Sequence, residues 1–131
     1  MNIGQEYRES FRITAELISA FARVTREHNP IHLDEEYAKK TVFRTRVAQG
    51  MLLGGLLSGV LGTRFPGVGT IYLSQNLTFL RPAFIGDEIT LCLTVREMLL
   101  EKNRLRLESE FVNQRGERVV RGETWVMPPL K

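Results

Sequence analysis

The chain has 131 residues, of which 43% are hydrophobic and 25% charged, and its formal net charge is +3. These values are ordinary for a globular protein, and the length suits one domain over residues 1–131. The modest positive charge is spread over the chain and forms no basic stripe interleaved with aromatics, so no nucleic-acid partner is expected.

Membrane insertion and secretion are not expected either. The longest apolar stretch, residues 50–62, is shorter than the ~20 residues that a helix needs to cross a bilayer. The amino terminus has no apolar run behind a basic start, so it does not resemble a secretory signal. A single cysteine, Cys92, allows no internal disulfide and suits a reducing compartment. We therefore expect a cytoplasmic protein.

The first elements along the chain are a strand and two helices. We expect a strand over Tyr7–Ile13, followed by an amphipathic helix over Thr14–Thr25 that Thr14 caps. Its apolar residues recur at helical spacing: Leu17, Ile18, Phe21 and Val24. The helix should end near the Asn29-Pro30 pair, because the residue before a proline avoids helical geometry. A short helix is expected over Asp34–Thr41.

A second long helix begins at Gly50. It is apolar on every side, which predicts burial all round. Gly54, Gly55 and Gly59 each weaken it by up to ~1 kcal/mol relative to Ala, so something should pack very close to it. A curved sheet wrapped around the helix would do so.

The remaining sequence alternates with a period of two residues and predicts four more strands. Turn-like breaks at residues 82–87, 101–103 and 114–117 separate them. The apolar faces are Ile71, Leu73, Leu77 and Phe79; Ile89, Leu91, Leu93 and Val95; Leu105, Leu107 and Phe111; and Val120, Thr124 and Val126. We expect these strands to form a meander, which with the helices gives an α+β domain with a sheet of about five strands.

The densest polar cluster covers residues 27–34, where a helix ends and a proline-containing loop begins. Glu27 and His32 are five residues apart and can converge across this loop. A carboxylate and an imidazole in one small pocket can exchange protons near neutral pH. A surface hydrogen bond between them is the alternative. Asn29 is expected to fix the loop through side-chain to backbone hydrogen bonds.

The start of the second long helix offers a further candidate. Free amides at a helix amino end can hold a developing oxyanion, and Gly50 has no side chain to keep a carbonyl away. Gly50 can equally ease packing of the helix on a sheet, and the two interpretations are compatible. A nearby group of basic residues could bind a phosphate-bearing ligand, although a solvated surface is the simpler alternative. These residues are Lys39, Lys40, Arg44 and Arg46.

Three motifs occur together in order: Asn-Pro-x-His-x-Asp from Asn29, Gly-Met-Leu-Leu from Gly50, and Pro-x-x-x-Gly-Asp from Pro82. With them the chain resembles, over nearly its whole length, the MaoC-type (R)-specific enoyl-CoA hydratases and related 3-hydroxyacyl-thioester dehydratases. The resemblance implies a hot-dog fold, a homodimer, and a pocket for a coenzyme A or acyl-carrier-protein thioester. It also implies reversible hydration of a trans-2-enoyl thioester to the (R)-3-hydroxyacyl thioester, with no metal or redox cofactor.

The resemblance assigns roles to individual residues. It implies that Glu27 and His32 activate the water and that the Gly50 amide binds the thioester oxygen. Substrate-binding positions are expected at Asn29, Gln49, Met51, Ser58, Arg44 and Arg46. Ser58 either faces the pocket or bonds back to its own helix.

Two residues depart from the family pattern. Glu27 stands where Asp is usual, and Gln49, which cannot titrate, stands where His is usual before the helix. These departures keep open a non-catalytic acyl-thioester-binding subunit as an alternative. An acyl-thioester hydrolase is another, because one fold can serve several chemistries.

Overall fold

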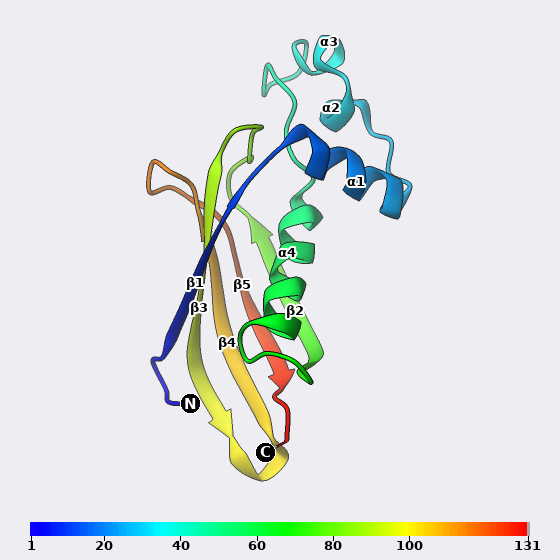
Figure 1. Cartoon of the computed structure of the whole chain (residues 1–131). Coiled ribbons are helices and arrows are strands. Elements are labelled where there is room, and N and C mark those ends of the chain that lie inside the picture. The colour runs from blue at the N-terminus through cyan, green and yellow to red at the C-terminus, as the bar shows by residue number, and fades with distance from the viewer. Residues whose placement is uncertain (131) are drawn as a thin grey trace.

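The computed structural model describes residues 1–130. They form one antiparallel sheet, one long helix against it and three shorter helices beyond its end (Figure 1). The elements, in chain order, are β1 (Glu6–Arg12), α1 (Ala15–Thr25), α2 (Pro30–Leu33), α3 (Glu35–Ala38), α4 (Gly50–Thr63), β2 (Ile71–Phe79), β3 (Glu88–Leu99), the 3-10 turn η1 (Leu100–Lys102), β4 (Arg104–Val112) and β5 (Arg118–Met127). The predicted α+β class and the five strands are confirmed.

The strand order is β1-β3-β4-β5-β2. Strands β3, β4 and β5 form a meander, but β2 pairs with β5 at one edge, so the expectation of a four-strand meander is wrong. The chain between β2 and β3 crosses the end of the sheet instead. Val47 bridges Phe84 there, and the Ala48 amide donates to the Ala83 carbonyl at 2.8 Å. Residues 47–48, just before α4, thus hold the β2–β3 loop across the end of the sheet. Strand β3 then pairs with β4 on the side away from β5.

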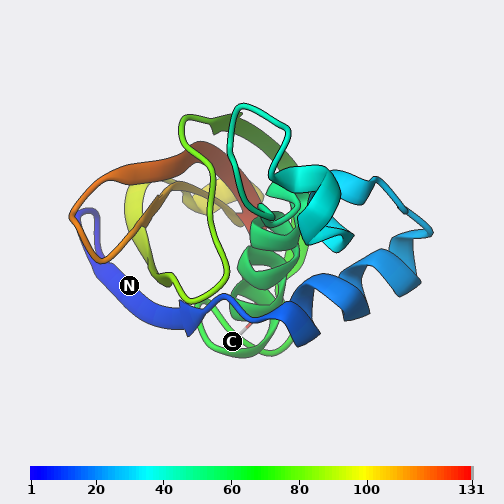
Figure 2. The same ribbon diagram turned by 90° about the horizontal axis from the view of Figure 1, so that it is seen from above.

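The core lies between α4 and the curved sheet that wraps it (Figures 1 and 2). Leu57 of the helix and Leu107 and Phe111 of the sheet are fully buried. The expected burial of α4 on all sides is wrong for the single chain, since Met51 is 56% exposed and Ser58 is exposed. One face of this very apolar helix therefore remains uncovered.

Strand β2 departs most from expectation. A bulge between Tyr72 and Ser74 leaves Leu73 as an inserted residue without a partner on β5 and reverses the alternation of side chains, so Ile71 does not share the face of Leu77 and Phe79. Ile71, Leu73 and Phe79 are 54%, 41% and 51% exposed because β2 is an edge strand and does not lie under a covering layer.

Helix α1 begins as predicted. The Thr14 hydroxyl accepts a hydrogen bond from the Leu17 amide at 3.1 Å, although Val24, expected on the apolar face, is 82% exposed. The predicted loop after α1 contains the additional helix α2. Helices α1 to α3 gather near the amino end of α4 (Figure 1). Within residues 1–130, no helix has the length and apolarity needed to span a membrane.

Candidate active site

Glu27 and His32 meet where α1 gives way to α2. Nε2 of His32 lies 2.9 Å from a carboxylate oxygen of Glu27, and Nδ1 lies 2.8 Å from the Val47 carbonyl. The His32 side chain is 12% exposed and that of Glu27 is 40% exposed, so the pair sits at the border between protein and solvent. The structure thus brings together the two residues that the sequence singled out.

The contacts of His32 determine where its protons lie. A carbonyl can only accept, so Nδ1 must carry a proton and donate it to Val47. The 2.9 Å contact between Nε2 and Glu27 then requires one further proton between them, because two lone pairs would repel each other. The pair therefore holds a proton that can move along a preformed hydrogen bond.

Backbone contacts fix the helix that carries His32. The Asn29 side chain caps α2 by accepting from the Ile31 amide at 3.1 Å, and Pro30 occupies the first turn, where its missing N–H costs nothing. Behind the site, Nε of Arg46 donates to the His32 carbonyl at 2.8 Å. Arg46 thus supports His32 from within the protein, whereas Arg44 is exposed.

The amino end of α4 forms the second part of the site. No acceptor within residues 1–130 pairs with the Gly50 amide, which begins the helix after Gln49. A methyl group on Gly50 would lie 2.6 Å from the ring of Phe79, so only glycine fits beneath this ring where it stands. A free donor at a helix amino end can stabilise negative charge on a substrate oxygen.

Gln49 is oriented inward. Its side chain is 2% exposed, and its amide nitrogen donates to the Ile18 carbonyl of α1 at 3.0 Å. Its side-chain oxygen has no partner within the described part of the chain. The side chain thus joins α1, which leads to Glu27, to the start of α4.

These groups line one cavity of ≈ 520 Å³, a size typical of small-molecule sites. Its lining includes Glu27, Asn29, His32, Gln49, Gly50, Met51, Phe79 and Arg81. Ser58 is outside it, in a neighbouring groove of ≈ 460 Å³ that shares Met51 and is also lined by Tyr72 and Gln75. Burial raises the pKa of Tyr72 to about 12, so its hydroxyl stays neutral and donates to Gln75. Met51 thus stands between the two spaces.

Comparison with known proteins establishes the family. The model of the MaoC like domain matches residues 1–115. The (R)-specific enoyl-CoA hydratase of Aeromonas caviae is 40% identical over 129 residues, which are 98% of this chain and 96% of that protein. The chain belongs to the MaoC-like domain family. The 3-hydroxybutyryl-CoA dehydratase of Methylorubrum extorquens is 42% identical over 91% of this chain and 75% of its own length.

Solved structures of two (R)-hydratases agree in fold. An unliganded R-hydratase of Pseudomonas aeruginosa superposes with a TM-score of 0.95 at 42% identity, covering 100% of this chain and 84% of that one. The Aeromonas caviae (R)-hydratase, described as involved in PHA biosynthesis, gives 0.95 at 40% identity, with 98% of each chain covered. The expected hot-dog fold is confirmed.

Several parts of the site were not predicted from the sequence. The Val47 carbonyl that orients His32 is a backbone group with no sequence signal, and Phe79 was expected only as part of a strand face. Arg81 also lines the cavity. Its position directly before Pro82, in one of the family motifs, was the available signal.

Proposed function

We propose that this MaoC-like protein is a hydratase that adds water reversibly to a trans-2-enoyl thioester and forms the (R)-3-hydroxyacyl thioester. The observation that carries the proposal is the 2.9 Å contact between Glu27 and His32 in the cavity that the Gly50 amide also lines. Relatives at 40–42% identity are hydratases and a dehydratase of this substrate class.

In the hydration direction, the three groups act as follows. The Glu27 carboxylate takes a proton from water, and the resulting hydroxide forms a bond to C3 of the enoyl group. The electron pair of the double bond moves onto the thioester oxygen, where the Gly50 amide stabilises it. His32 then delivers its Nε2 proton to C2. Transfer of the proton from Glu27 to His32 across their contact restores the starting state.

Other predicted residues receive supporting roles in the proposal. Asn29 and Gln49 hold the two halves of the site through the α2 cap and the contact with Ile18. Met51 and Ser58 line the path that an acyl chain could follow from the cavity into the neighbouring groove. Arg44 is exposed, and within residues 1–130 no carboxylate pairs with it, which suits a role toward the phosphates of a coenzyme A or acyl-carrier-protein thioester.

We propose further that residues 1–131 act as a single cytoplasmic domain that forms a homodimer. An edge strand with exposed apolar side chains is a template for pairing, and Ile71, Leu73 and Met51 are more than 40% exposed on β2 and α4. A second copy placed by twofold symmetry would cover the same surface on both partners.

The test is incubation of the purified protein with a panel of trans-2-enoyl-CoA substrates of increasing chain length, followed by loss of enoyl absorbance. Water addition with (R) product supports the proposal. A saturated acyl-CoA is the control: release of free thiol from it would indicate a hydrolase instead. Glu27 replaces the Asp that is usual in the family, which suggested a non-catalytic subunit as an alternative. Its carboxylate nevertheless reaches Nε2 of His32, which favours a catalytic role.

A further inference from the structure

A cationic side chain stands at the cavity without a full partner. Arg81 belongs to the lining, and its side chain is 57% exposed. Its nearest carboxylate within residues 1–130 is Glu117, at 3.6 Å, which is too long for a hydrogen bond. The five N–H donors of this guanidinium are therefore available to a ligand.

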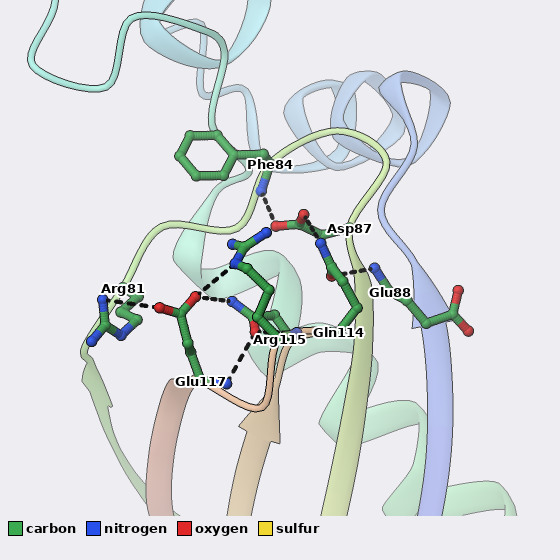
Figure 3. A network of polar contacts seen from close by, with 8 residues as sticks. Arg81, Phe84, Asp87, Glu88, Gln114, Arg115 and Glu117 are labelled. Atoms are coloured by element: carbon green, nitrogen blue, oxygen red, sulfur yellow. Dashed lines mark hydrogen bonds and ion pairs between the residues drawn. The ribbon is translucent and has the colours of Figure 1, made fainter.

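Glu117 is committed to other groups. One of its oxygens accepts from Arg115 Nε and from the Asn113 side-chain amide, each at 2.9 Å. The hydrogen bond from Asn113, followed by that from Arg115, lowers the pKa of Glu117, so it stays ionised near neutral pH. Arg81 and Arg115 reach this one carboxylate from different sides (Figure 3). The cluster of Arg81, Arg115 and Glu117 therefore has a net charge of +1.

The backbone beneath Arg81 is firmly held. Its amide donates to the Val119 carbonyl at 3.2 Å, and Pro82 follows it. Further along the loop, Asp87, which is 6% exposed, accepts from the Phe84 amide and from the Gln114 side chain, both at 2.9 Å (Figure 3). The loop is thus tied to the β4–β5 turn, and Arg81 projects from a fixed position.

We infer that Arg81 binds a phosphate group of the carrier to which the enoyl thioester is attached. This inference rests on the proposed function and adds the residue that recognises the carrier. A guanidinium presents paired donors that match phosphate oxygens, and the excess positive charge attracts the anion. Arg81 and Gly50, whose amide would hold the thioester oxygen, line the same cavity. Arg81 is thus a substrate-binding residue that takes no part in proton transfer.

The experiment compares three thioesters of one trans-2-enoyl acid: with pantetheine, which has no phosphate, with 4′-phosphopantetheine, and with coenzyme A. For Arg81→Gln, KM for the coenzyme A thioester should rise about tenfold, equivalent to about 1.4 kcal/mol. Both kcat and the KM for the pantetheine thioester should stay unchanged. Arg8→Gln is the matched control, because the Arg8 side chain is 64% exposed, against 57% for Arg81, and pairs with Glu6 on strand β1, outside the cavity lining.

Each pattern of results is decisive. A penalty shared by phosphopantetheine and coenzyme A assigns Arg81 to the phosphate that coenzyme A and acyl carrier protein have in common. A penalty with coenzyme A alone assigns it to the nucleotide phosphates. Unchanged KM for all three, or an equal loss on pantetheine, overturns the inference. If the wild type hydrates none of them, the proposed function fails separately, and calorimetric binding of saturated acyl-CoA and acyl-pantetheine still tests Arg81.

Discussion

Two substitutions of His32 distinguish its role in proton transfer from its hydrogen bond to the Val47 carbonyl. His32→Ala removes both the Nε2 proton and the hydrogen bond to the Val47 carbonyl, whereas Asn in its place retains a donor for Val47 and cannot shuttle a proton. A general acid typically contributes 10²–10⁴-fold, so both variants should lose about 2.7–5.4 kcal/mol of transition-state stabilisation. His32→Asn should remain more stable than His32→Ala by about 0.5–1.5 kcal/mol, the usual net value of one hydrogen bond.

The assay pairs initial rates of enoyl-CoA hydration with thermal unfolding of the three proteins. We expect two equally inactive variants whose unfolding temperatures differ by a few degrees. Near-wild-type turnover by His32→Asn would show that the side chain acts only through its contact with Val47 and not as a general acid.

Three other predictions follow from the same contacts. Glu27→Asp shortens the side chain that now reaches Nε2 at 2.9 Å, so turnover should fall, and a rise in rate would mean that the site is not adapted to Glu. Light scattering at micromolar concentration should give a dimer mass that Leu73→Lys on edge strand β2 reduces to a monomer, whereas a monomeric wild type would contradict the proposed assembly. Because hydrogen bonds lower the pKa of Glu117 below its usual 4.5, its stabilisation is present above that value and is lost as pH falls through the folded-state pKa. The difference in unfolding temperature between wild type and Glu117→Gln should therefore shrink as pH falls below 4.5, and a pH-independent difference would speak against a charged Glu117.

Local sequence signals predicted the parts of this protein that depend on neighbouring residues. Thr14 caps α1 as its position indicated, and the proline after Asn29 shapes a short segment that allows Glu27 and His32 to meet. Because only five positions and a rigid turn separate Glu27 from His32, their side chains can adopt few other relative arrangements. The alternation of β3 and β4 also predicted their buried faces.

Features set by distant contacts were not predictable in the same way. The place of β2 at the sheet edge depends on its pairing with β5, and its bulge reverses a pattern that looked regular in sequence. From the sequence, Gln49 was predicted to contact the ligand. Its amide nitrogen instead donates to the Ile18 carbonyl of α1, 31 positions earlier in the chain. Arg46 likewise turns inward because α2, an unexpected helix, presents a free carbonyl at His32.

The most direct test of Glu27 as the general base is the rate of hydration by wild type and Glu27→Gln on the best trans-2-enoyl-CoA, with thioester binding measured alongside. Gln preserves the size of the side chain and its hydrogen bonding but cannot accept the proton from water. We expect wild type to form the (R)-3-hydroxyacyl thioester, and we expect Glu27→Gln to bind the thioester equally well but to turn over about 10²–10⁴-fold more slowly. Equal rates in the two proteins would contradict this role for Glu27, since no general base can be lost without effect.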